Sequence, residues 1–318
     1  MTTQSFFPAA ATPEEFERVR RDEAVLRPGI EAVLDRQGLR GRPIERFPDG
    51  SLPVYAIGSS LVLKVYPPFD LVERDRESLV MRALEGRLPV PTPEVQAAGE
   101  LDGWGYVLMT RLGGELLSSA WFRVPGASRI HIAAELGEAL AALHAVGDPG
   151  LPSPCGAWDV FLDTQRRSCV ERQRARGLGE EWVRQIPALL DSTPLGGASA
   201  RSLLHTEIMR EHLLVEGTRD GFRLSGLFDF EPAMVGAPEY ELASVGVFFS
   251  AGDPALLRTL LLAYGLGDDE LSPDLSRRAL AYALLHRYSS LSWYLTRVPP
   301  PPGTRTLEGL AEHWYGVR

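Results

Sequence analysis

One lysine, Lys64, stands among 32 arginines in a chain of 318 residues. It lies in the segment LVLKVY (61–66), whose aliphatic and β-branched residues predict a strand. A lone charge in such a strand needs a partner or a ligand, because burying an unpaired ammonium group is costly. Lysine is a compact point charge and arginine a broad planar fork, so tight phosphate sites distinguish them. We therefore expect Lys64 to contact phosphate groups at a position where arginine would not serve.

A partner for this lysine is predicted in the helix that follows. In RESLVMRAL, Glu77 falls on the same helical stripe as Val80, Met81 and Leu84, so its carboxylate is expected to be buried and to need a cation. A strand lysine paired with a helix glutamate positions nucleotide phosphates in kinases. The loop Asp49-Gly50-Ser51 precedes the first strand and is expected over the phosphates. The chain has no G-x-x-x-x-G-K-[ST], which excludes a P-loop.

A second group of candidates lies in the stretch 203–231. Glu207 is followed five residues later by His212, which opens an apolar strand, and a turn and a second strand lead to Asp229. The two strands of a hairpin bring residues that are distant along the chain together, so we expect these three side chains to converge. A carboxylate base and two metal ligands form the catalytic half of a phosphoryl-transfer site.

The elements that must position these residues change character near Leu112-Gly113-Gly114. Before this junction we expect a helix at 14–36, strands at 52–57 and 61–66, a helix at 70–86, and two strands within 90–112 around Asp102-Gly103. After it we expect helices around 132–143 and at 157–176, a hairpin of 212–216 with 222–228, and helices at 238–250, 253–264, 273–296 and 304–315. The expected fold class is α+β: a small antiparallel-sheet lobe for nucleotide binding (1–112) and a larger, mainly helical lobe for catalysis and substrate binding (113–318).

The amino-acid composition limits the kinds of ligand and partner that we expect this protein to bind. The net charge of -9 argues against nucleic acid and suits a cationic ligand. No apolar run reaches the ~18 residues of a membrane span, and the N-terminus does not read as a secretory signal, so we expect a cytoplasmic protein that is a monomer or a weak dimer and does not bind membranes. Cys155 and Cys169 have no CxxC spacing and are expected to be reduced thiols on a helix.

From about residue 45 to 250 the chain resembles the aminoglycoside phosphotransferase family. That family reads H-G-D-x-x-x-x-N, then a hairpin, then I-D-[WF]-E and G-D-P-x-[YF]-[DE]-L-A; here the frame reads HTEIMREH, GLFDFE and GAPEYELA. Upstream, LVLKVY with RESLVMRAL matches the nucleotide lobe, GYVLMTRLGGELL the hinge, and LGEALAALH the long helix. The resemblance implies a two-lobed protein-kinase-like fold. It also implies transfer of the γ-phosphoryl group of ATP, or of GTP, to a hydroxyl of a small molecule with Mg²⁺ or Mn²⁺, the best guess being an aminoglycoside-type antibiotic.

The resemblance also implies roles for individual residues. The catalytic positions are Glu207 and His205, the metal ligands His212 and Asp229, and the nucleotide-binding residues Lys64, Glu77, Gly50, Ser51 and the hinge Met109, Thr110, Arg111 and Leu112. Glu241 matches the acidic residue that braces the catalytic loop. Candidate acceptor-lining residues are Glu231, Glu239, Trp158, Asp159, Tyr288, Trp293 and Trp314.

The sequence departs from the family pattern at three of these positions. Glu207 replaces aspartate, His212 replaces asparagine, and Ala237 replaces the aspartate of G-D-P. Because imidazole favours softer metals than Mg²⁺, His212 predicts tolerance of Mn²⁺.

Other functions are weighed against this one. A nucleotide-binding protein without transferase activity would explain Glu207 and His212 as marks of lost catalysis, and ATP turnover separates the two. A protein kinase is disfavoured, because no activation segment ending in A-P-E follows Asp229; the Ala-Pro-Glu at 237–239 comes only eight residues later, within GAPEYELA. Zinc deaminases need P-C-x-x-C and zincins need HExxH, and neither motif is present. The isolated histidines, His131, His144, His286 and His313, are expected to be surface or core residues.

Overall fold

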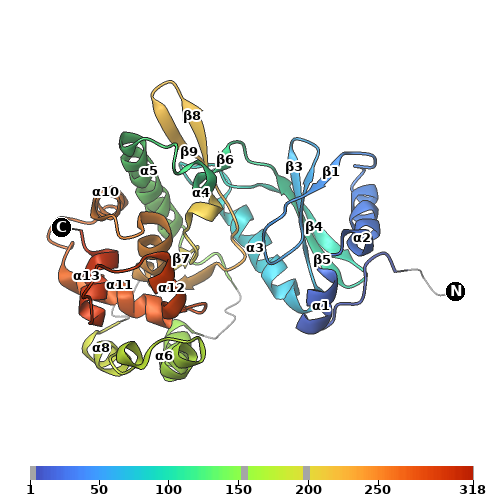
Figure 1. The fold of residues 1–318 in the computed structure, drawn as a ribbon. Coiled ribbons are helices and arrows are strands. Elements are labelled where there is room, and N and C mark those ends of the chain that lie inside the picture. The colour runs from blue at the N-terminus through green and yellow to red at the C-terminus, as the bar shows by residue number, and fades with distance from the viewer. Residues whose placement is uncertain (1–4, 152–156, 196–200, 318) are drawn as a thin grey trace. The chain divides into compact units, whose positions relative to one another are not determined.

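The computed structural model describes residues 5–151, 157–195 and 201–317, so Cys155 lies outside the described residues. The chain forms two compact units (Figure 1). The smaller unit contains the described residues up to Glu85 together with Thr92–Leu112 and Asp229–Glu231. The larger unit contains Gly86–Pro91, Gly113–Phe228 and the chain from Pro232 onward. An antiparallel sheet in one unit and many helices in the other confirm the α+β fold class.

The smaller unit is built on a five-stranded antiparallel sheet with the strand order β1-β2-β3-β5-β4. Its strands are β1 (Ile44–Arg46), β2 (Val54–Ile57), β3 (Leu61–Tyr66), β4 (Val95–Leu101) and β5 (Trp104–Thr110). Gly58 turns the chain between β2 and β3 with φ of 60°, and Asp102-Gly103 joins β4 to β5 as predicted. The predicted strand carrying Lys64 is therefore the central strand, where its main chain is paired on both sides.

Helices accompany this sheet, but the expected helix at 14–36 is two helices. These are α1 (Pro13–Val19) and α2 (Glu23–Arg36). The prediction of a single helix was wrong because Asp22 caps α2: its side chain accepts hydrogen bonds from the N–H groups of Ala24 and Val25. The third helix, α3 (Leu71–Leu84), buries Glu77 with Val80.

The larger unit is organised around the long helix α5 (Gly126–Ala145), which packs against α10 (Pro254–Tyr264), β7 (Ser202–Leu204) and β9 (Gly221–Leu227). Strand β9 forms the predicted hairpin with β8 (Leu213–Thr218), and β7 pairs with β10 (Met234–Gly236). The catalytic-loop sequence starts where β7 ends.

The remaining elements of the larger unit are all shorter than α5. They are β6 (Glu115–Leu116), α4 (Leu117–Ala120), α6 (Trp158–Ala175), α7 (Glu180–Val183), α8 (Ile186–Ser192), α11 (Pro273–Leu285), α12 (Leu291–Arg297) and α13 (Leu307–Tyr315). The helix expected at 238–250 is a 3₁₀ turn (Pro238–Glu241), α9 (Leu242–Ser244) and a π-helical turn (Val245–Ser250). The helix expected at 273–296 is interrupted between α11 and α12. Within the described ranges no helix is long and apolar enough to cross a membrane.

Candidate functional site

Three carboxylates surround Lys64 in the smaller unit. Its Nζ lies 2.7 Å from Asp229 Oδ1, 2.9 Å from Glu77 Oε2 and 3.5 Å from Glu231 Oε2. The ion pair with Glu77 that the sequence predicts is present. Glu231, which the sequence predicts to line the acceptor site, also lies beside this lysine, two residues after Asp229 with its φ of 69°. We call Lys64, Glu77, Asp229 and Glu231 the lysine cluster.

The charged groups of the lysine cluster shift one another's pKa values. Burial opposes the charge of Lys64, but Asp229 and Glu77 hold the pKa of its ammonium group well above the ordinary value. Burial raises the pKa of Glu77, and Lys64 opposes that rise. The hydroxyl of Tyr66, a residue that sequence reasoning missed, donates a hydrogen bond to Glu77. One cation against three carboxylates leaves a surplus of negative charge, which suits an added cation.

The hinge residues have main-chain groups that are largely committed to the sheet. The N–H of Thr110 donates to Glu94 O at 3.0 Å, and the N–H of Arg111 donates to Ser60 O at 2.8 Å. Neither group is available to an adenine ring while these bonds hold. In the expected phosphate loop, Gly50 has φ of 117°, a left-handed conformation that favours glycine.

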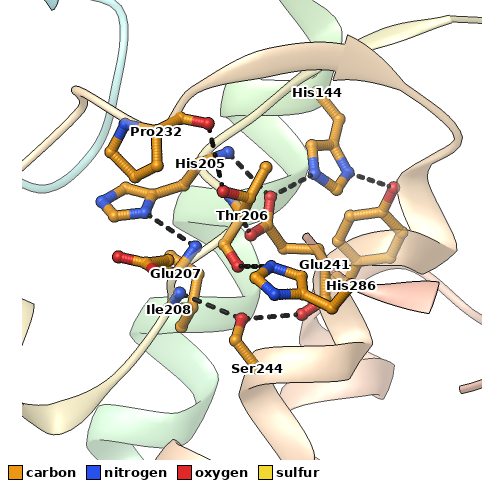
Figure 2. A network of polar contacts seen from close by, with 10 residues as sticks. His144, His205, Thr206, Glu207, Ile208, Pro232, Glu241, Ser244 and His286 are labelled. Atoms are coloured by element: carbon orange, nitrogen blue, oxygen red, sulfur yellow. Dashed lines mark hydrogen bonds and ion pairs between the residues drawn. The ribbon is translucent and has the colours of Figure 1, made fainter. Parts of the chain in front are cut away.

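The larger unit holds the catalytic loop through one buried carboxylate. Glu241, with a relative exposure of 1%, accepts the N–H of His205 at 2.9 Å and the N–H of Thr206 at 2.7 Å (Figure 2). Thr206 has φ of 74°, which is costly for a residue with a β-carbon. These two bonds therefore stabilise a strained conformation immediately before Glu207. Glu241 has the bracing geometry that the family resemblance implies.

His205 has the contacts of a positioning residue, which corrects the prediction of a catalytic role. It is fully buried, its Nε2–H donates to Phe228 O at 2.9 Å, and its Nδ1 accepts the N–H of Glu207 at 3.3 Å. Both ring nitrogens thus bond to main-chain groups. The ring ties the catalytic loop to Phe228, the residue that follows β9 and precedes Asp229.

The hydrogen-bond partner of the His212 ring shows which of its two nitrogens carries a proton. Nδ1 lies 2.9 Å from the carbonyl oxygen of Glu207, which can only accept, so Nδ1 carries the proton. In the neutral ring Nε2 then has the lone pair. A histidine that donates its other N–H to a backbone carbonyl is the usual arrangement of a metal ligand. Among the residues that the structure describes, no group of three or more His, Cys, Asp or Glu side chains is arranged to hold a metal.

Two further residues that support the loop were not identified as functional from the sequence. The Nε2–H of His286 donates to Thr206 O at 3.1 Å. Ser244 Oγ accepts the N–H of Ile208 at 3.0 Å and donates to Glu241 O at 3.1 Å (Figure 2). Neither belongs to a motif at fixed spacing from Glu207, so no sequence signal indicated them.

The candidate acceptor residues lie in different environments. Trp158 and Trp314 are buried in the core, so their assignment to the acceptor site was wrong. Asp159 is exposed and pairs with Arg201, and Glu239 forms two hydrogen bonds to Arg278. Tyr288 and Trp293 are about half exposed. Trp158 and Trp314 were misassigned because a tryptophan in a core cannot be distinguished by sequence from one in a binding site.

Comparison with known proteins agrees with this geometry. Residues 43–280 match the phosphotransferase enzyme family. Viomycin phosphotransferase of Streptomyces vinaceus is 30% identical over 217 residues, 64% of this chain and 72% of that protein. The GDP and kanamycin complex of APH(2″)-IIIa has a TM-score of 0.66 and 18% identity, covering 81% of this chain and 90% of that chain. The streptomycin-ATP ternary complex of APH(2″)-IIa has a TM-score of 0.57 and 14% identity, covering 90% and 97%.

The structural likenesses confirm the protein-kinase-like fold, and the sequence match extends over well more than half of the chain. Together with the lysine cluster and the braced catalytic loop, these findings show that the chain belongs to the phosphotransferase enzyme family and is a small-molecule kinase.

Proposed function

We propose that this kinase transfers the γ-phosphoryl group of ATP to a hydroxyl of an amine-bearing antibiotic in the cytoplasm, where ATP is supplied, and acts as a monomer or a weak dimer. The observation that carries the proposal is the ammonium group of Lys64, held at 2.9 Å from Glu77 and 2.7 Å from Asp229. The acceptor class rests on the relative named for viomycin and on neighbours solved with kanamycin and streptomycin. The net charge of -9 suits a cationic acceptor.

In this proposal the smaller unit binds the nucleotide. Lys64 contacts the phosphates, and Glu77 fixes the position of its ammonium group. The Leu112 N–H is the proposed donor to the adenine ring, because the N–H groups of Thr110 and Arg111 donate within the sheet. ATP is preferred as the donor in this proposal, with GTP as the competitor to test, since both nucleotide classes occur among the neighbours.

Asp229 and His212 are the proposed ligands of Mg²⁺ or Mn²⁺. The carboxylate of Asp229 is an oxygen ligand of the kind Mg²⁺ prefers, and the Nε2 lone pair of His212 suits Mn²⁺ better. Two protein ligands fit an ion that takes the rest of its coordination from phosphate oxygens and water. When bound, the ion neutralises charge on the phosphates.

Glu207 is the proposed base. Its carboxylate accepts the proton of the acceptor hydroxyl while that oxygen forms a bond to the γ-phosphorus, and the bond to the bridging β–γ oxygen breaks to release ADP. This chemistry depends on positioning. Glu241, His205 and His286 fix the main chain that leads into Glu207.

Mass spectrometry over a panel of viomycin, kanamycin, streptomycin and gentamicin tests the proposal, with ATP or GTP as the donor. We expect one antibiotic to gain a single phosphoryl group with ATP. Asp229→Asn and Glu207→Gln should lower turnover by roughly 10²-fold or more, whereas Asp220→Asn, in the exposed β8–β9 turn, should not. ATP binding without transfer to any acceptor would instead favour the nucleotide-binding protein without transferase activity.

A further inference from the structure

A cavity of about 510 Å³ lies inside the larger unit, and its lining includes neither Glu207 nor any residue of the lysine cluster. Its walls come from α5, α10, α11 and the segment 237–242. Most of the surface is apolar, supplied by residues such as Leu140, Leu260, Leu261 and Leu275. The volume falls within the range of about 300–1,000 Å³ that small-molecule sites occupy. We call it the α5–α10 cavity.

The acidic, basic and histidine side chains of the α5–α10 cavity are few and fall into two sets. Glu239 and Arg278 are partly exposed, with side-chain exposures of 36% and 29%, and pair with each other through bonds of 2.8 and 2.9 Å. Their charges cancel, so the exposed side offers no net charge to a ligand. His144 and Glu241 are buried, with exposures of 8% and 1%. The carboxylate of Glu241 already accepts the N–H groups of His205 and Thr206 and faces His144, so an uncharged ligand is favoured over an ion.

Hydrogen-bond directions at the buried side define which polar group fits. Nε2 of His144 faces Glu241 Oε2 at 3.5 Å, and a carboxylate only accepts, so Nε2 carries the proton. Nδ1 of His144 then accepts the hydroxyl proton of Tyr264 at 2.8 Å. Because that proton is committed, the Tyr264 oxygen presents lone pairs to the cavity it lines. A ligand with one hydrogen-bond donor on an apolar body matches these groups.

The same buried side is joined to the catalytic loop. The carboxylate of Glu241 that faces His144 also accepts the N–H groups of His205 and Thr206, and these bonds hold Thr206 at φ of 74° (Figure 2). A molecule that contacts Tyr264 and His144 therefore acts on the carboxylate that fixes the main chain before Glu207. A shift of Glu241 weakens two hydrogen bonds at once, so occupancy is expected to lower turnover.

We propose that the α5–α10 cavity is a second ligand site, which takes a small, uncharged, largely apolar molecule with one hydroxyl donor and lowers the rate of phosphoryl transfer through Glu241. Ala237 leaves room for this ligand. It lies on the cavity wall at the position where the family pattern has aspartate.

The test uses 4′-fluorobiphenyl-4-ol as the probe and fluorine NMR of the full-length protein as the binding measurement. Leu261→Trp fills the cavity from α10, and Leu262→Trp, at the 40% exposed neighbour outside the lining, is the matched control. The probe should bind the wild type and the Leu262→Trp variant, and Leu261→Trp should weaken binding by at least about tenfold. Absence of binding to the wild type, or equal binding to all three proteins, overturns the site.

Ala237→Asp provides a second variant in case Leu261→Trp does not fold. Ala237 is the N-cap of the 3₁₀ turn Pro238–Glu241, a position where aspartate is favoured, so the fold should be retained while a carboxylate enters the wall. It should weaken probe binding as strongly as Leu261→Trp does. Retained binding by a folded Ala237→Asp protein also overturns the site.

The turnover number tests whether a ligand in the α5–α10 cavity affects the catalytic loop through Glu241. Saturating probe should lower kcat of the wild type and of Leu262→Trp by about fivefold or more and leave Leu261→Trp unchanged. Probe that binds without changing kcat overturns the link to Glu241. Since binding is measured without turnover, failure of the proposed antibiotic acceptor leaves the binding result intact; any ATP-dependent turnover, including hydrolysis, serves for the kinetic comparison.

Discussion

At the scale of single residues, Lys64 shows why one lysine is retained in an arginine-rich chain. An ammonium group is compact enough to lie within 3.5 Å of three carboxylates at once, in a side chain that is only 9% exposed. A guanidinium group is larger and planar, and it distributes its charge over a fork. The site therefore discriminates by shape between two side chains of equal charge.

Lys64→Arg tests this discrimination. We expect kcat/KM for ATP to fall by roughly 10²-fold or more, because a displacement of about an ångström at a positioned group has that cost. Steady-state kinetics with ATP measures the effect, and circular dichroism checks the fold. Arg219→Lys, the reverse exchange at an exposed turn, should have no effect. Native turnover by a folded Lys64→Arg protein would remove Lys64 from the phosphate site.

At the scale of elements, α5 and α10 approach each other at a glycine. A β-carbon on Gly137 would overlap the carbonyl oxygen of Leu260 and lie 2.9 Å from the amide nitrogen of Tyr264. The backbones of the two helices thus approach as closely as they do only because residue 137 has no side chain. This contact also fixes one wall of the α5–α10 cavity.

Gly137→Ala should therefore destabilise the protein although alanine is the better helix former. Overpacking costs about 1–3 kcal/mol, and the gain in helix propensity is about 1 kcal/mol or less. Gly126→Ala is the matched control on the same helix, where an added β-carbon meets no atom within 4 Å. Thermal unfolding should show a lower Tm for Gly137→Ala only. An equal or higher Tm would mean that the two helices can separate without cost.

The end of α11 is joined to the catalytic loop by His286, and this contact depends on pH. Burial, aided by the charge of Arg287, lowers the pKa of His286 to about 3. In the unfolded chain the ring titrates near its ordinary value, so the unfolded state binds more protons at acid pH. Stability from the neutral ring is complete above about pH 6.5 and is lost as the pH falls toward the folded-state value.

Urea unfolding at about pH 7 and about pH 5 measures this dependence. From the two pKa values the wild type should lose about 2 kcal/mol between these conditions through His286 alone. His286→Gln keeps a donor for Thr206 O but cannot be protonated, so its loss on acidification should be smaller by that amount. His131→Gln, at a ring that is 62% exposed, is the control and should follow the wild type. Parallel curves for wild type and His286→Gln would contradict the buried neutral assignment.

The sequence predicted those elements whose formation depends on residues close together in the chain. The two hairpins depend on alternation and on turn residues such as Gly58, and Glu77 shares a stripe that can be counted along one helix. The break between α11 and α12 has no such local cause, because His286 leaves the helix to bond the carbonyl of Thr206, a residue 80 positions away in the chain. The break at Asp22 had a local signal, a capping aspartate, that the helical pattern around it obscured.

The candidate site was predictable to a similar degree. Lys64, Glu77 and Asp229 were predicted from residue type and spacing, and the structure brings these three together within the smaller unit. The role of Glu231 was not predictable, because its direction depends on the left-handed φ of Asp229. The α5–α10 cavity could not be predicted either, since a leucine facing a cavity and a leucine in a packed core occupy the same positions of a helical pattern.

At the scale of the whole molecule, the excess of acidic groups creates an electric field that attracts or repels charged ligands before they bind. A net charge of -9 attracts a polycationic acceptor and repels a nucleotide of like charge. Added salt screens both effects, because the Debye length falls from about 30 Å at 0.01 M to about 8 Å at 0.15 M. The two substrates of one enzyme should therefore respond to salt in opposite directions.

We predict that KM for an aminoglycoside acceptor such as kanamycin, or for whichever amine-bearing antibiotic accepts phosphate, rises several-fold as KCl increases from about 20 to about 300 mM. KM for ATP should stay constant or fall, because screening removes repulsion while the close contact with the buried Lys64 is screened little. Steady-state kinetics with each substrate varied in turn provides the measurement. The Mg²⁺ concentration is kept the same at every KCl concentration, which controls for loss of the metal. A parallel rise in both KM values would show that salt acts on the nucleotide site. A salt-independent KM for the acceptor would show that the acidic surface does not attract it, and the acceptor class should then be sought among uncharged hydroxyl compounds.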